Sequence, residues 1–226
     1  TRSRARPDGE PTPEMVDYYG QRASAGLIIS EGIQPNADGQ GYCRTPGLHS
    51  PEHETAWRSI ADAVNKQDGK IVAQLMHVGR ISSTANKISG ARTLAPSALQ
   101  ARGEMYTDTS GMQPFDTPIE MTTADIARTI DDYAAAAKMA IRAGFAGVEL
   151  HATSGYLPAQ FLSTGTNQRT DAYGDSLKGR LKFALDLIDA LTESVGAGRV
   201  GLRICPGNRF NDLRDDDPQE TFTALL

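Results

Sequence analysis

The chain has 226 residues, of which 39% are hydrophobic and 23% charged, and its formal net charge is −5 at pH 7. This composition is typical of globular proteins and excludes collagen-like, mucin-like and disordered classes. The negative charge offers no net basic surface to nucleic acid or to an anionic membrane. No apolar run approaches the roughly 20 residues that span a membrane, so we expect neither nucleic acid nor membrane among the partners.

The two cysteines, Cys43 and Cys205, lie far apart and fit no metal-binding spacing. A chain of this length can bury its own core without a disulfide. We therefore expect two free thiols and a reducing, cytoplasmic location. Residues 1–13 carry charges and prolines but no apolar core, so they do not form a signal peptide.

Strand and helix patterns alternate along the chain. Residues 13–23 predict a short helix, and residues 26–30 predict a short apolar strand. The next helix begins at Ser50, which is a suitable N-cap because proline follows it at the first helical position. Residues 70–75 predict a second strand. This order is typical of successive strand–helix units.

The second half repeats the pattern. A helix starts near Thr123 and ends before Gly144, a strand follows at residues 146–150, and a last strand occupies residues 200–204. Between these strands, a helix from about Asp175 carries one aliphatic stripe of Leu177, Leu181, Leu185, Ile188 and Leu191. The strands are short, rich in valine, isoleucine and leucine, and not cleanly alternating, which suits parallel strands covered on both faces. The sequence thus predicts an α/β fold with a parallel sheet.

One connection is unusually long. Residues 76–121 show little periodicity, whereas loops beyond about 12–15 residues are usually functional or disordered. We expect this segment to fold as a lid over the carboxyl ends of the strands, with a small hairpin. The alternative is a flexible surface insertion.

Polar residues stand where the predicted strands end. They are Glu31, Gln74, His77, His151 and Arg203. Because the carboxyl ends of parallel strands lie on one face, we expect these residues to converge in space. Each also has a purely structural interpretation, such as a cap or a brace for a turn. The exception is the arginine, because a buried guanidinium needs an anion or several acceptors.

The segment His151-Ala152-Thr153-Ser154-Gly155-Tyr156 is the densest polar cluster. A histidine can donate a hydrogen bond to a carbonyl oxygen, and a tyrosine can act as a general acid. Together they suit the reduction of an activated alkene. The chain lacks metal-ligand spacings, a Gly-x-Ser-x-Gly elbow, a Walker loop and a GxGxxG fingerprint. We therefore predict no metal site.

Six ordered blocks carry a resemblance to a known family. The chain resembles the Old Yellow Enzyme family, most closely its bacterial N-ethylmaleimide reductase branch, over essentially all 226 residues. The blocks are TRSRA at 1–5, LIISEG at 27–32, QLMHVGR at 74–80, GFAGVELH at 144–151, GYL at 155–157 and NQRTD at 167–171.

The resemblance implies an eight-stranded TIM (β/α)8 barrel that binds FMN non-covalently. NAD(P)H reduces the flavin, and hydride then passes to the β-carbon of an α,β-unsaturated carbonyl or nitro compound. By this comparison, residues 1–226 form a single FMN-binding domain that is incomplete at both ends. It is a partial barrel without the first strand and without the last three, whose loops hold the FMN phosphate.

The resemblance also implies roles for individual residues. On the flavin side, Thr1 matches the threonine that donates a hydrogen bond to the flavin C4 carbonyl. Gly32 matches a small residue whose backbone N–H faces the flavin, and Gln74 matches the glutamine at the pyrimidine edge of the flavin ring. Arg203 matches the arginine near N1 and C2, where negative charge accumulates on the reduced ring.

On the substrate side, His151 matches the first residue that binds the substrate carbonyl, Tyr156 the proton donor and Tyr42 an aromatic wall. Ser154 stands where the family has Asn or His. A serine hydroxyl donates one hydrogen bond, so we expect weaker polarisation of the substrate or a bridging water. Met76 replaces a frequent tryptophan and predicts a roomier pocket.

Two alternatives remain at this stage. The chain could be a non-catalytic barrel fragment that needs a partner segment to fold or bind flavin, because four parallel strands cannot close a barrel and leave exposed edges. It could also be a relative of the dienoyl-CoA reductases, but that group needs a cysteine cluster for iron–sulfur, which two distant cysteines do not provide.

Overall fold

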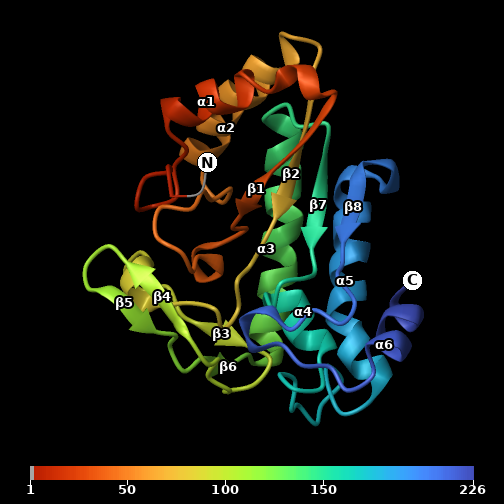
Figure 1. Cartoon of the computed structure of the whole chain (residues 1–226). Coiled ribbons are helices and arrows are strands. Elements are labelled where there is room, and N and C mark those ends of the chain that lie inside the picture. The colour runs from red at the N-terminus through yellow and green to blue at the C-terminus, as the bar shows by residue number, and fades with distance from the viewer. Residues whose placement is uncertain (1–2) are drawn as a thin grey trace.

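The four expected strands form one parallel sheet in the computed structural model, which describes residues 3–226. The strands β1 (Leu27–Ile33), β2 (Lys70–Leu75), β7 (Gly147–His151) and β8 (Val200–Arg203) lie side by side in that order. Every neighbouring pair is parallel, so all four carboxyl ends face the same side (Figure 1). The predicted α/β class with a parallel sheet is confirmed.

Helices follow the strands in chain order and cover the sheet (Figure 1). Helix α3 packs against α5, and α1 packs against α2. The α-helices are α1 (Pro13–Gly20), α2 (Pro51–Asn65), α3 (Thr123–Arg142), α4 (Leu157–Leu162), α5 (Leu177–Val195) and α6 (Pro218–Leu225). Short 3₁₀ segments occupy Ala23–Ala25, Ala37–Gly39, Thr84–Asn86, Ala197–Arg199 and Phe210–Asp212.

Local capping chemistry fixes where the long helices begin. The Ser50 hydroxyl accepts a hydrogen bond from the His53 N–H at 3.2 Å, as expected for the N-cap of α2. At the start of α3, Thr122 and Asp125 form a reciprocal capping box. Gly144 follows that helix with φ of +97°, a conformation that suits glycine. The expected helix boundaries at Ser50 and near Thr123 are therefore confirmed.

The long segment after β2 is ordered. Within it, β4 (Glu104–Thr107) and β5 (Gly111–Pro114) form an antiparallel hairpin, while β3 (Leu94–Ala95) pairs with β6 (Ile119–Glu120). Figure 1 shows this hairpin beyond the carboxyl ends of the strands. Met105 and Phe115 on this segment pack in one apolar cluster with Met76 and Tyr156. The expected lid with a hairpin is confirmed.

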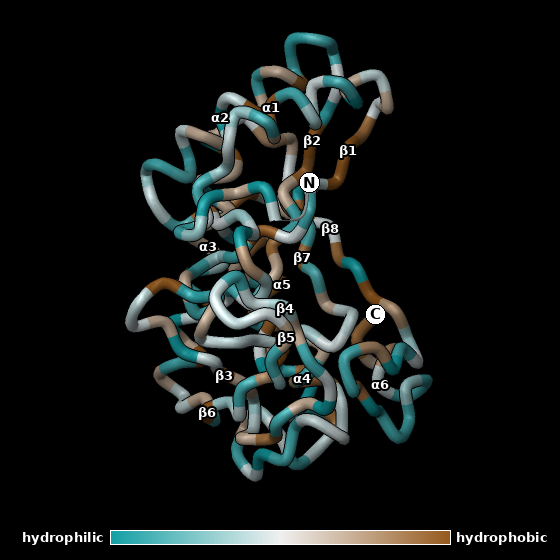
Figure 2. The backbone as a smooth tube through the Cα atoms, turned by 60° about the vertical axis from the view of Figure 1, so that its left-hand side comes forward, coloured by the Kyte–Doolittle hydropathy of each residue, from teal (hydrophilic) through white to brown (hydrophobic). Residues whose placement is uncertain are grey.

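Burial of the strands differs from the expectation at the edges of the sheet. All five residues of β7 are buried, as expected for a strand covered on both faces. In the edge strand β1, however, Leu27 is 56% and Ile29 37% exposed, although Figure 2 shows β1 to be as hydrophobic as β2. Side chains of a strand alternate between the two faces of the sheet, so Leu27 and Ile29 project from the same face, and that face is left partly uncovered at β1.

The aliphatic stripe predicted for α5 is partly wrong. The buried stripe of this helix includes Leu181, Ala184, Leu187 and Leu191, whereas Leu185 is 40% exposed. Spacing alone places Leu185 four residues after Leu181, but the helix contacts α3 and the sheet through the adjacent face.

We predict that Trp57→Ala lowers the free energy of unfolding by about 3–5 kcal/mol. Trp57 is fully buried, its ring lies 5.4 Å from that of Phe145, and its Nε1–H donates to the Gly47 carbonyl at 3.0 Å. The measurement is urea unfolding followed by circular dichroism, because this is the only tryptophan. As a control, Leu185→Ala should change the stability by no more than about 0.5 kcal/mol. Equal losses in both variants would contradict this account of the core.

Candidate active site

A cavity of about 340 Å³ opens at the carboxyl ends of the parallel strands. This volume is within the range of about 300–1,000 Å³ that small-molecule sites occupy. Six of the predicted site residues line the cavity together: Gly32, Tyr42, Gln74, His151, Ser154 and Tyr156. Glu31 and Met76, which the sequence places at strand ends, also line it, as do Thr45 and Phe210, which were not predicted.

A bulge in β1 shapes the floor of the cavity. The register of β1 against β2 shifts between Ile29 and Gly32. At this point the Gln74 backbone N–H donates to the Ser30 hydroxyl at 3.0 Å. Glu31 is held from the other side, because its N–H donates to the Tyr19 hydroxyl at 3.0 Å and its carboxylate accepts from that hydroxyl at 3.1 Å. The bulge thus turns the end of β1 toward the cavity.

Gly32 lies in close contact with Met76. A Cβ atom at Gly32 would lie 2.5 Å from the methionine Cε and 2.6 Å from its Sδ. The absence of a side chain therefore lets the sulfur side chain pack over β1 at the edge of the cavity, and it leaves the glycine backbone open to a ligand.

A buried carboxylate joins three strands through the cavity-lining Gln74, although neither Glu149 nor Arg203 lines the cavity itself. Glu149 on β7 accepts a hydrogen bond from Gln74 Nε2 on β2 at 2.7 Å. The same carboxylate accepts from Arg203 Nε at 2.7 Å and from its Nη2 at 3.1 Å. Sequence reasoning missed Glu149. The signal that could have identified it is an acidic residue inside an apolar strand, Gly147-Val148-Glu149-Leu150.

His151, Tyr156 and Tyr42 lie close together in the lining of the cavity. The Tyr156 and Tyr42 hydroxyl oxygens lie 3.2 Å apart, and the His151 ring lies 5.2 Å from the Tyr156 ring. Burial lowers the pKa of His151 to about 4, so the imidazole is neutral at pH 7. A neutral imidazole still carries one N–H, which can donate to a carbonyl oxygen.

A tight turn orients Ser154 and Tyr156. Ser154 adopts φ of +58°, a left-handed conformation that is uncommon outside glycine, and Gly155 follows with φ of +73°. The Ser154 carbonyl accepts from Asn211 Nδ2 at 2.8 Å, and the Gly155 carbonyl accepts from Gln160 Nε2 at 2.7 Å. These bonds hold the turn so that both side chains line the same cavity.

The lid is fastened to the loop after β8. Arg80 donates to the Leu99 carbonyl at 3.2 Å and to the Asp212 carbonyl at 2.8 Å. Arg102, at the base of the hairpin, binds the Asp212 carboxylate at 2.6 Å. Phe210 lies on this same loop, two residues before Asp212, and it lines the cavity. The bonds from Arg80 and Arg102 to Asp212 therefore help to hold Phe210 at the cavity.

Three expectations about strand-end residues need correction or limitation. Arg203 is not buried, because its side chain is 44% exposed on the edge strand β8, and its partner is Glu149. His77 is buried but does not line the cavity. Its Nδ1 accepts from the Gly79 N–H at 3.1 Å, so the structural interpretation holds for this residue. Thr1 lies outside the described residues.

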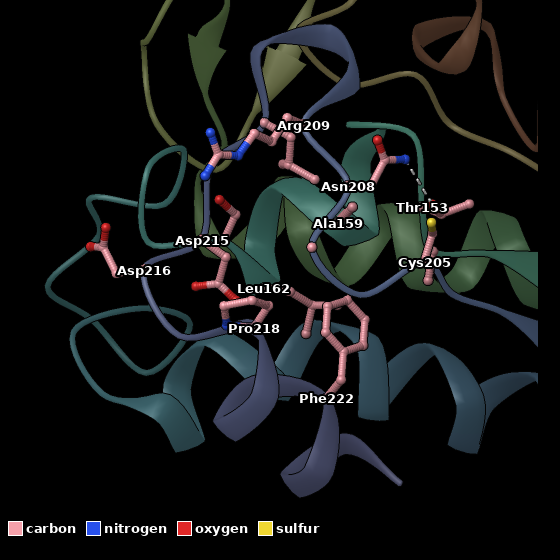
Figure 3. A pocket seen from close by; sticks show the side chains of 14 residues that line it. Thr153, Ala159, Leu162, Cys205, Asn208, Arg209, Asp215, Asp216, Pro218 and Phe222 are labelled. Carbon is pink, nitrogen blue, oxygen red and sulfur yellow. Dashed lines mark hydrogen bonds between the residues drawn. The ribbon is translucent and has the colours of Figure 1, made fainter.

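A second, smaller cavity of about 180 Å³ lies between α4, α6 and the loop after β8 (Figure 3). Asn208 donates to the Thr153 hydroxyl at 3.4 Å across its rim, and Phe222 closes one side. None of its lining residues belongs to the first cavity. Its volume is below the usual range for small-molecule sites, so the first cavity is the stronger candidate.

Both cysteines are free, with Cys43 buried and Cys205 exposed. Within residues 3–226, no group of three or more His, Cys, Asp or Glu side chains has a geometry that could hold a metal ion. In the same part of the chain, no helix is both long and apolar enough to cross a membrane.

Sites assembled from the carboxyl ends of successive parallel strands, with loops closing over them, define the class of (β/α) barrel enzymes. The family model of the NADH:flavin oxidoreductase / NADH oxidase family matches residues 1–224, and the chain belongs to this family.

Individual relatives agree with this assignment. The chain is 42% identical over 223 residues to a probable flavin mononucleotide-dependent alkene reductase of Leishmania infantum. The matched region covers 97% of this chain and 61% of that relative. It resembles the Old Yellow Enzyme homologue of Zymomonas mobilis with a TM-score of 0.95 at 38% identity, over 100% of this chain and 62% of that one. The structure of morphinone reductase in complex with tetrahydroNAD matches with a TM-score of 0.94 at 43% identity, over 100% of this chain and 63% of that one.

The expected relationship to the Old Yellow Enzyme family and the expected partial barrel are thereby confirmed. The chain spans about 60% of the length of the relatives it matches.

We predict that Gly32→Ala and Met76→Ala are energetically coupled. The alanine Cβ forces the methionine to move, at a cost of about 1–3 kcal/mol. Removing the methionine side chain in the double variant relieves that clash. The free energies of unfolding of both single variants and the double variant, measured in urea, should show coupling of at least about 0.5 kcal/mol. Strictly additive losses would contradict the contact.

We predict that His151 titrates near pH 4 in the folded protein. In the unfolded chain a histidine binds its proton near pH 6.5. The folded state thus binds this proton more weakly, and this side chain lowers stability as the pH falls from about 6.5 to 4. NMR titration of the imidazole signals tests this, with His151→Asn identifying the resonance. A midpoint near 6.5 would contradict burial of the ring.

Proposed function

We propose that the protein is an FMN-dependent oxidoreductase that reduces the C=C bond of α,β-unsaturated carbonyl or nitro compounds, with NAD(P)H as the source of hydride. The observation that carries this proposal is the convergence of His151 and Tyr156 with Gly32 and Gln74 in one cavity at the strand ends. Family membership supports the flavin, and the alkene reductase among the relatives supports the substrate class.

The residues beneath and around the cavity suit a flavin ring. The Gln74 side chain offers both an amide donor and an acceptor. Gly32 has no side chain, so its backbone itself lines the cavity, and an added Cβ there would collide with Met76. Arg203 provides positive charge next to Gln74 through their shared partner Glu149. When bound, FMN supplies the capacity to accept and donate hydride. We further propose that Thr1 donates to the same cofactor.

The other wall suits a substrate carbonyl and a proton. A neutral His151 can donate one hydrogen bond to the carbonyl oxygen and thereby polarise the double bond. Tyr156 can deliver a proton to the carbon that hydride does not attack. As Tyr156 loses its proton, the Tyr42 hydroxyl 3.2 Å away can donate to the phenolate oxygen. Ser154 supplies a single further hydroxyl donor where the family has a larger side chain.

The lid favours this chemistry by limiting access of water. Met105 and Phe115 on the lid segment pack with Met76 and Tyr156 in one apolar cluster, and Tyr42 contacts the same cluster. The proton donor therefore sits against an apolar wall, where hydrogen bonds to a developing charge are stronger than in water. We infer a small activated alkene as substrate, and we propose the cytoplasm as the place of action.

A second proposal rests on a different observation. The strand β1 is at the edge of the sheet and exposes the apolar Leu27 and Ile29 on one face, which favours a barrel unit that completes its fold or binds flavin only with a partner segment. In both proposals, residues 1–226 act as a single FMN-binding unit.

Uptake of FMN separates these proposals. The purified chain is mixed with FMN and separated from free cofactor by gel filtration, and the visible spectrum is recorded. Co-eluting flavin with a perturbed absorption band supports the oxidoreductase. Absence of bound flavin, together with a circular dichroism spectrum that keeps its far-UV signal but loses its near-UV signal, supports the fragment that needs a partner. With flavin bound, turnover of cyclohexenone or N-ethylmaleimide with NADPH or NADH then tests the substrate class.

We predict that Tyr156→Phe slows reduction of the alkene by about 10²–10⁴-fold, the usual contribution of a general acid. Reduction of the bound flavin by NAD(P)H should persist, because that step needs no proton from this hydroxyl. Stopped-flow absorbance measures the two half-reactions separately. Tyr42→Phe is the matched control and should cost less, because it removes the neighbouring hydroxyl and leaves the proton donor. Equal loss in both half-reactions of Tyr156→Phe would contradict the assigned role.

A further inference from the structure

We propose that Glu149 is a positioning residue for the flavin site: it sets the orientation of Gln74 and Arg203 and offsets the positive charge of the arginine. This inference rests on the proposed function, because its electronic consequence concerns a bound flavin. It adds to that function a residue that determines how strongly the site favours the reduced cofactor.

Glu149 is placed to act on both partners at once. Glu149 is only 8% exposed, and it lies on strand β7 between β2 and β8. The parallel register aligns Gln74 with Glu149, and it aligns Arg203 with His151, two residues further along β7. A carboxylate this buried is costly unless it is paired and hydrogen-bonded. Here three N–H groups from two neighbouring strands satisfy it.

The carboxylate decides which end of the Gln74 amide faces the cavity. A carboxylate only accepts hydrogen bonds, so the amide must turn its NH₂ group toward Glu149, as observed at 2.7 Å. The amide carbonyl is then turned away from the carboxylate and remains available to a ligand. Without this partner, the amide could flip and exchange its donor and acceptor.

The same carboxylate fixes the plane of the Arg203 guanidinium. Nε and Nη2 bind the two carboxylate oxygens at 2.7 and 3.1 Å, the bidentate geometry that arginine forms best. Guanidinium has five N–H donors, of which this pairing uses two. The other three have no partner among residues 3–226, and the side chain is 44% exposed. They are therefore free to bind a ligand, in an orientation that Glu149 dictates.

The pairing also sets the local charge. A reduced flavin ring carries more negative charge than an oxidised one, so an uncompensated guanidinium beside it favours reduction. The Glu149 carboxylate offsets that charge. Removing the negative charge while keeping the shape should therefore shift the equilibrium toward the reduced cofactor.

The first experiment needs no cofactor. In the apoprotein, the Arg203 Nε–H should give an NMR signal that is shifted and protected from exchange with water, identified by its absence in Arg203→Lys. Glu149→Gln removes the charge and leaves one amide oxygen, which cannot replace both carboxylate oxygens that bind Nε and Nη2, so protection should fall at least tenfold. Unchanged protection in Glu149→Gln, or no protection in the wild type, would overturn the positioning role.

The second experiment measures the midpoint potential of bound FMN by dye equilibration. Glu149→Gln should raise the ratio of reduced to oxidised FMN about tenfold at a fixed solution potential, equivalent to about 30 mV for a two-electron couple. Glu149→Asp keeps the charge and should remain near the wild-type potential. A merely structural role would disturb both variants alike, whereas an electronic role separates them.

Glu54→Gln is the matched control. Glu54 pairs with Arg142 at 2.6 Å and with Arg58 at 3.2 Å, on the outer surface of α2 and α3 and outside the cavity lining. Its loss should leave the potential unchanged. A potential that does not move in Glu149→Gln, or moves equally in Glu54→Gln, would overturn the electronic role. A wild-type chain that takes up no FMN would overturn the proposed function and this electronic role, while the apoprotein measurement still decides the positioning.

Discussion

Parallel pairing of β1, β2, β7 and β8 is the constraint on which the site depends. In a parallel sheet the carboxyl ends of all strands lie on one side, so the residues that end them come together although up to about three quarters of the chain separates them in sequence. The register does more than bring strand ends together. It sets Gln74 opposite Glu149 and His151 opposite Arg203, and one buried carboxylate can therefore bond to groups on both neighbouring strands.

The two walls of the cavity are held by different kinds of interaction. Charge-assisted hydrogen bonds to Glu149 hold the side chains of Gln74 and Arg203. The opposite wall is a strained turn, with Ser154 and Gly155 in left-handed conformations held by side chains from α4 and from the loop after β8. Strain of this kind is stored where a side chain must be presented in one orientation, here that of Tyr156.

The lid couples these walls to the rest of the molecule. Arg80 and Arg102 fasten it to Asp212, and its apolar residues cover Met76 and Tyr156. A segment without regular periodicity is thus ordered by a few long-range polar bonds and one small apolar cluster.

The sequence by itself determined the four parallel strands, the helix starts at Ser50 and near Thr123, and most of the residues at the strand ends. These features depend on local chemistry: short apolar runs, Ser50 as an N-cap, Gly144 after a helix end, and blocks such as GFAGVELH that carry the family resemblance. Tertiary structure alone decided which strand-end residues share the cavity. His77 turned inward to brace a turn, Leu185 lay off the buried stripe, and Arg203 was exposed on an edge strand and paired with Glu149. Exposure and pairing depend on which elements pack beside a residue, and neighbours distant in sequence supply that information.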